Sequence, residues 1–133
     1  MVNVTRSAAL LMLDPHTRAW ATLPAAPKPT SNVGAAVVAG RMYVSGGPRV
    51  AVSSLQCYDV AAGRWDTGCA SMAEARDSHG VAALHGEVWA VGGGGGNAGL
   101  ASVEVYSPRL NIWRAGVPLP HQCFDCTCVV VQS

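Results

Sequence analysis

Two stretches decide the fold: MYVSGG at residues 42–47 and VWAVGG at residues 88–93, which begin 46 residues apart. Each is a short apolar strand pattern closed by a glycine pair. Each is also followed by a tyrosine and then a tryptophan at nearly the same distances. Self-similarity at a period of this size, in segments that all have strand patterns, predicts a radial array of small sheets, a β-propeller.

The second half of the repeat occurs three times. SLQCYDVAAGRW ends at Trp65, SVEVYSPRLNIW ends 48 residues later at Trp113, and ALLMLDPHTRAW ends 45 residues before Trp65, at Trp20. Glycine pairs are expected where a strand leaves a blade and its backbone approaches a neighbouring sheet, and the tryptophans are expected as apolar plugs between blades. The predicted structural positions of the repeat are Gly46, Gly47, Tyr58, Trp65, Gly92, Gly93, Tyr106 and Trp113.

The glycine pair, the tyrosine about a dozen residues later and the tryptophan after it resemble the kelch repeat, and above all the kelch domains of kelch-like BTB adaptor proteins. The first copy departs from the pattern, since Leu13 stands where the others have tyrosine. The resemblance implies an all-β, partial kelch-type propeller over residues 1–133. We expect an incomplete blade at about 8–32, blades at 33–78 and 79–125, and the first strand of a further blade at 126–133, with its strand at 127–131.

Composition narrows the function. Half of the residues are apolar, 13% are charged, the formal net charge is +1, and the basic residues are scattered along the chain. Binding to nucleic acid or to an anionic membrane needs clustered Lys and Arg, so neither partner is expected. No apolar run is long enough for a signal peptide or a membrane span, which predicts a cytoplasmic protein.

Loops that enter the inner strands, and loops that follow the glycine pairs, are the predicted binding rim, because loops on a rigid scaffold carry much of the binding in proteins. The predicted rim residues are Thr30, Ser31, Asn32, Arg49, Arg76, Asp77, Ser78, Asn97, Phe124 and Asp125. The resemblance implies that Arg76 lies at the mouth of the central channel and holds a carboxylate of a partner. The alternative is that Arg76 pairs with a neighbouring loop carbonyl or with an acid such as Glu74 or Asp77.

A cysteine cluster near the C-terminus invites a metal hypothesis, since His121, Cys123, Cys126 and Cys128 fall within eight residues. No second cysteine pair completes a zinc site, and ordinary burial explains cysteines on an inner strand. An odd total of five cysteines favours a reducing compartment over a disulfide framework. The sequence therefore predicts no metal and no cofactor.

No histidine has the spacing of a nucleophile–base–acid arrangement, so the chain is predicted not to be an enzyme. The resemblance implies a noncatalytic module that binds another protein or peptide. In a full-length form it would be the substrate receptor of a cullin-type ubiquitin ligase. An actin-linked kelch scaffold is the alternative, and a galactose-oxidase-like metalloenzyme fragment is the rival from another class. Open blade edges, including residues 128–131, also predict self-association.

Overall fold

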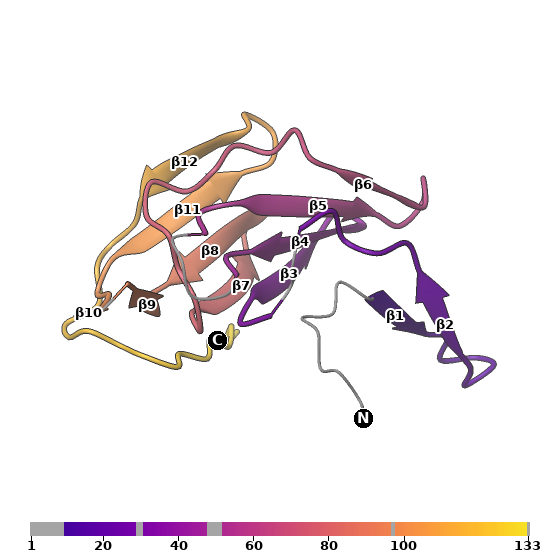
Figure 1. Cartoon of the computed structure of the whole chain (residues 1–133), viewed down its shortest axis with the longest axis horizontal. Coiled ribbons are helices and arrows are strands. Elements are labelled where there is room, and N and C mark those ends of the chain that lie inside the picture. The colour runs from indigo at the N-terminus through magenta and orange to yellow at the C-terminus, as the bar shows by residue number, and fades with distance from the viewer. Residues whose placement is uncertain (1–9, 29–30, 48–51, 97, 133) are drawn as a thin grey trace, which may run out of the picture.

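The computed structural model describes residues 10–28, 31–47, 52–96 and 98–132, and every regular element in them is a β-strand (Figure 1). Two four-stranded antiparallel sheets form the body of the molecule. The first sheet has the order β3-β4-β5-β6, with β3 (Gly34–Val38), β4 (Arg41–Ser45), β5 (Leu55–Asp59) and β6 (Arg64–Asp66). The second has the order β7-β8-β11-β12, with β7 (Gly80–Leu84), β8 (Glu87–Val91), β11 (Val103–Ser107) and β12 (Ile112–Ala115).

The two sheets share one register, which confirms the repeat. Tyr43 pairs with Cys57 in the first sheet, and Trp89 pairs with Val105 at the corresponding place in the second. Each repeat tyrosine lies opposite its tryptophan: Tyr58 opposite Trp65, and Tyr106 opposite Trp113. The chain is therefore an all-β, partial propeller with two complete blades.

The innermost hairpins turn through two residues with positive φ, Ala39-Gly40 (49° and 75°) and His85-Gly86 (52° and 75°). Two central residues of positive φ define a type I′ turn, which matches the right-handed twist of the strands that it joins.

The core lies between the two sheets. Its buried cluster consists of Tyr43, Leu55, Cys57, Val88 and Tyr106. Across the blade interface the rings of Tyr43 and Tyr106 are 5.7 Å apart between centroids and tilted by 54°, a favourable geometry for an aromatic pair. An aromatic contact between the blades is therefore made in the core by two tyrosines.

Trp65 and Trp113 are expected as apolar plugs between blades, and Trp113 does pack against the core cluster. Neither tryptophan belongs to the buried cluster itself. Both are only half-buried. Their indole N–H groups donate to the carbonyl oxygens of Pro24 and Ala70, at 2.8 Å each. Each tryptophan thus fixes the linker that leads into its own blade, because its polar edge needs a partner that the core does not offer.

The inner strands β3 and β7 lie side by side, and glycine permits the close approach. A Cβ at Gly34 would overlap Val81 of β7, and a Cβ at Gly80 would overlap the sulfur of Cys128. The C-terminal segment therefore follows β7, where an inner strand of a further blade is expected (Figure 1). Residues 127–131 are nevertheless not a strand, because no described residue pairs with their backbone.

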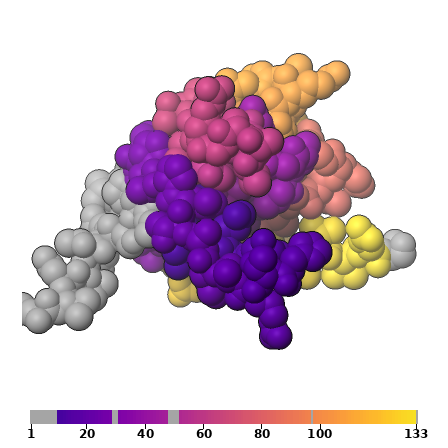
Figure 2. All heavy atoms as spheres, turned by 90° about the vertical axis from the view of Figure 1, so that its right-hand side faces the viewer, coloured from indigo at the N-terminus to yellow at the C-terminus, as the bar shows by residue number. Residues whose placement is uncertain are grey.

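At the other end of the chain, β1 (Leu10–Leu13) and β2 (Trp20–Leu23) form a separate two-stranded sheet. Leu13 pairs with Trp20, the relation that Tyr58 has to Trp65. In the space-filling view this hairpin forms the indigo lobe, and the yellow C-terminal segment projects at the right (Figure 2). None of the described residues form a helix able to cross a membrane.

Candidate functional site

Three rim loops meet at one end of the sheets. The backbone N–H of Ser78 donates to the carbonyl oxygen of Asn32 at 3.1 Å, and the N–H of Cys126 donates to that of Ser78 at 3.0 Å. Neighbouring loops are therefore joined by their own main chains, which leaves side chains on this end available for binding. Of the predicted rim residues, Thr30, Arg49 and Asn97 lie outside the described residues.

Backbone hydrogen bonds fix which residues of the third loop correspond to those of the second, at a spacing one residue shorter than the 48 residues between Trp65 and Trp113. Gly47 N–H donates to Arg76 O, and Gly93 N–H donates to Cys123 O, so Cys123 takes the place of Arg76. By the same shift Phe124 corresponds to Asp77. Asp125 then corresponds to Ser78, and the two share a positive φ of 49° and 48°. The spacing of 48 residues between tryptophans overshoots here because the linker after Trp113 is one residue shorter.

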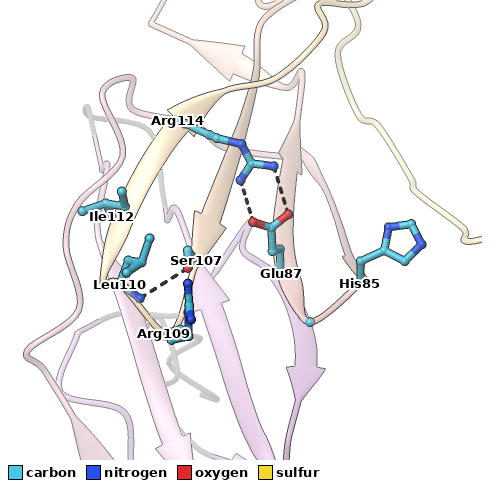
Figure 3. A pocket seen from close by; sticks show the side chains of 8 residues that line it. His85, Glu87, Ser107, Arg109, Leu110, Ile112 and Arg114 are labelled. Atoms are coloured by element: carbon cyan, nitrogen blue, oxygen red, sulfur yellow. Dashed lines mark hydrogen bonds and ion pairs between the residues drawn. The ribbon is translucent and has the colours of Figure 1, made fainter.

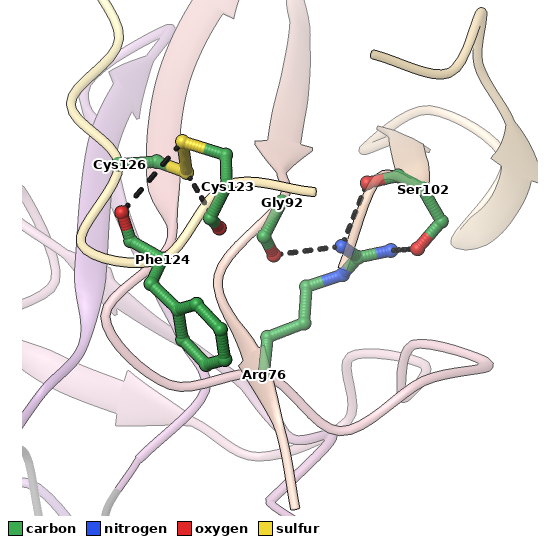
Figure 4. The surroundings of a disulfide bond; sticks show 6 residues. All are labelled: Arg76, Gly92, Ser102, Cys123, Phe124 and Cys126. Atoms are coloured by element: carbon green, nitrogen blue, oxygen red, sulfur yellow. Dashed lines mark hydrogen bonds between the residues drawn. A yellow bond between two sulfur atoms is a disulfide. The ribbon is translucent and has the colours of Figure 1, made fainter. Parts of the chain in front are cut away.

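Arg76 does not face a partner, which corrects the main site prediction. The residue is 1% exposed. Its guanidinium donates to Glu104 Oε2 from Nε (3.3 Å) and from Nη2 (3.0 Å). It also donates from Nη1 to the carbonyl oxygens of Gly92 (2.9 Å) and Ser102 (2.8 Å), and from Nη2 to Ser102 Oγ (2.8 Å) (Figure 4). All five N–H donors are thus used inside the protein, so Arg76 holds a loop to β11.

Glu104 is the residue that sequence reasoning missed. Besides Arg76, its carboxylate accepts the backbone N–H groups of Ala73 (2.6 Å) and Glu74 (3.2 Å). At the equivalent position of the first blade stands Gln56, also buried, whose Oε1 accepts the N–H of Lys28 at 2.9 Å. A polar residue in the middle of an apolar strand, at the same place in two repeats, was the signal that could have found it.

A buried Ser–His pair lies beneath the rim. Ser45 Oγ is 2.8 Å from His79 Nε2, and both residues are buried. Burial, followed by the positive charge of Arg76, lowers the pKa of His79 to about 4, so the ring is neutral at pH 7. Ser45 is fully enclosed, and no described carboxylate orients His79, so the pair has the geometry of a packing contact rather than of an activated nucleophile.

Asp77 and Phe124 occupy equivalent positions on adjacent blades and converge on a small hairpin formed by β9 (Gly94–Gly95) and β10 (Ala98–Gly99). Asp77 and Gly94 exchange two backbone hydrogen bonds, at 3.1 and 2.8 Å. Across this hairpin Gly94 pairs with Gly99, and both lie against Phe124.

Cys123 and Cys126 form a disulfide around Phe124 and Asp125 (Figure 4). This corrects the expectation that the odd cysteine count disfavours a disulfide. The loop is also held by its backbone, since Cys123 N–H donates to Leu100 O at 3.0 Å and Gly93 N–H donates to Cys123 O at 2.7 Å. Cys57, Cys69 and Cys128 are free thiols. Within the part of the chain that the structure describes, no three side chains of the metal-ligating types come together.

At the opposite end of the second sheet, the two hairpin turns enclose an open hollow of about 480 Å³ (Figure 3). Arg114 makes a bidentate ion pair with Glu87 there, at 2.7 and 3.0 Å, and this hydrogen bonding holds the pKa of Glu87 below its usual value. No predicted rim residue lies in this hollow, so substitutions in the hollow can serve as controls for substitutions in the rim.

Comparison with known proteins gives relatives that carry kelch repeats. Kelch-like protein 33 of Homo sapiens is 33% identical over 125 residues, which are 89% of this chain and 23% of that protein. Kelch repeat and BTB domain-containing protein 13 of Homo sapiens is 30% identical over 128 residues, 92% of this chain and 28% of that protein. Kelch-like ECH-associated protein 1A of Danio rerio is 34% identical over 86 residues, which are 60% of this chain and 14% of that protein.

The chain thus spans less than a third of the length of these relatives. The Kelch motif itself matches residues 29–68 and 75–120. Those spans cover β3 to β6 and β7 to β12, the two complete blades. The chain therefore belongs to the kelch-repeat family and resembles the kelch domains of kelch-like proteins.

Proposed function

We propose that this chain is the partner-binding propeller segment of an intracellular, cytoplasmic kelch-like adaptor, and that it binds a protein or peptide through its rim without catalysis. The observation that carries the proposal is the rim itself. Its loops are joined main chain to main chain, which fixes their backbones while Phe124 and Asp125 remain exposed to solvent.

The binding surface consists of the rim residues other than Arg76: Ser31, Asn32, Asp77, Ser78, Phe124 and Asp125 among the described residues, with Thr30, Arg49 and Asn97 as further predictions. In a longer protein we propose that this segment selects the substrate of a cullin-type ubiquitin ligase. The name of one relative, Kelch repeat and BTB domain-containing protein 13, supports this adaptor architecture. The proposed blade boundaries are 33–78 and 79–125.

Affinity capture with matched variants tests the proposal. Phe124→Arg adds bulk and charge to the rim, while Leu110→Arg adds the same group to an exposed site in the opposite hollow. We expect Phe124→Arg to lose the proteins captured by the wild-type chain, and Leu110→Arg to retain them, with equal urea denaturation midpoints. A partner that is lost only with Leu110→Arg would show that the rim is not the binding surface.

A further inference from the structure

The glycine hairpin brings a carboxylate and an aromatic ring together at the rim. A Cβ at Gly94 would overlap the carboxylate oxygen Oδ1 of Asp77 and would lie 3.7 Å from Cε1 of Phe124. A Cβ at Gly99, the cross-strand partner of Gly94, would lie 2.8 Å from Cε2 of the same ring. Because Gly94 and Gly99 have no side chains, the Phe124 ring and the Asp77 carboxylate can both lie against this hairpin.

The charges around this point are acidic. Arg76, the basic residue beside Asp77, is neutralised by Glu104 inside the protein. Oε1 of Glu74 also lies 4.0 Å from Nη2 of the same guanidinium. Asp77 and Asp125 therefore set the sign of the charge on the described part of the rim.

Phe124 is 58% exposed, although backbone hydrogen bonds of Cys123 and Cys126 hold the loop on both sides of it. The Cys123–Cys126 disulfide closes the loop around it, and the backbone of Cys123 bonds to Gly93 and Leu100. An exposed ring on a constrained loop loses little conformational freedom on binding, and aromatic residues of this kind are frequent anchors of interfaces.

We propose that Asp77 and Phe124 form a subsite for one basic side chain, an arginine in preference to a lysine, carried by the partner protein. This rests on the proposed function of the rim. A guanidinium can stack on the phenyl face and at the same time donate two parallel hydrogen bonds to the carboxylate, whereas an ammonium lacks the planar fork. The rim thus selects a basic partner segment, the opposite of what an exposed Arg76 would select.

A random peptide library selected on the full 133-residue chain tests the subsite. We expect the selected peptides to share an arginine at one position. Replacing that arginine by citrulline, which keeps the shape and removes the charge, should weaken binding by about tenfold or more. Asp77→Asn should produce the same loss, and Phe124→Leu, which keeps an apolar side chain on the glycine floor, should produce a smaller one.

Glu87→Gln is the control, because it removes one negative charge from the hollow at the opposite end of the sheet and should leave binding unchanged. The subsite is overturned if the arginine and citrulline forms of a selected peptide bind the chain equally well, or if Asp77→Asn leaves their binding unchanged. If such peptides still lose binding with Phe124→Arg, the subsite fails and the rim remains the binding surface. If no selected peptide depends on any rim residue, both proposals fail.

Discussion

Arg76 and Glu104 illustrate, at the scale of single residues, how two blades of one repeat differ in chemistry. The second blade has a buried ion pair, whereas the first has Thr30 and Gln56 at the same positions of the sequence. Both residues of the ion pair are replaced in the first blade, because burying one charge without its partner is energetically costly. The sequence of the repeat therefore has either two charged or two neutral residues at these positions, and we expect that they cannot be exchanged singly.

Arg76→Met is therefore expected to lower the free energy of unfolding by about 3 to 5 kcal/mol, since it leaves the Glu104 carboxylate buried and unpaired. Adding Glu104→Gln, which imitates the first blade, should recover part of this loss. Arg114→Met breaks an exposed pair and should cost about 1 kcal/mol or less. Urea denaturation checks all three, and strictly additive losses for Arg76 and Glu104 would contradict the coupling.

His79 predicts a pH dependence of stability. Its folded-state pKa, about 4, lies below the ordinary histidine value of about 6.5, so between these values the unfolded chain binds a proton that the folded chain does not. Stability is therefore fully present above pH 6.5 and falls as the pH is lowered, by roughly 2 kcal/mol between pH 7 and pH 5. Urea midpoints should shift accordingly. His79→Gln should remove most of this shift, whereas His85→Gln, at an exposed turn, should not.

At the scale of elements, the rim loop closed by Cys123 and Cys126 makes a chemical prediction. Unfolding without reductant, followed by alkylation, should modify three cysteines, and with reductant all five. In the folded chain, burial raises the pKa of the thiols of Cys57, Cys69 and Cys128, so their alkylation should be slow. Mass spectrometry reads both counts, and five modified cysteines without reductant would show that the loop is open.

The strands of the two blades could be predicted from sequence, because glycine pairs, alternating apolar residues and turn glycines are local signals. Two features of the rim could not. The position of the third loop depends on a linker that is one residue shorter, and only its hydrogen bonds to Gly93 reveal the shift. The burial of Arg76 depends on Glu104, 28 residues away along the chain.

Residues 127–131 failed as a predicted strand for a related reason. Their β-prone sequence is a local property, whereas a strand also needs a hydrogen-bonded neighbour, which no described residue supplies. The repeat therefore placed this segment next to β7 correctly, whereas propensity could not assign its conformation.

At the scale of the whole molecule, apolar side chains are exposed at both ends of the array. The N-terminal hairpin presents Leu11 and Trp20, which are 58% and 67% exposed, and the C-terminal segment presents Val131, which is 87% exposed. These residues belong to blade positions whose neighbouring strands are not among the described residues. Apolar surface of this kind attracts other protein surface.

We therefore expect the isolated 133-residue chain to self-associate at micromolar concentration, with a sedimentation coefficient that rises with protein concentration. Trp20→Ser with Val131→Ser should shift the distribution toward the monomer, because both substitutions remove exposed apolar area and leave the core between the sheets intact. Val117→Ser is the matched control, since Val117 is equally exposed but lies after β12, away from both ends. A wild-type chain that sediments as one monomeric species at all concentrations would mean that the chain covers these edges by itself.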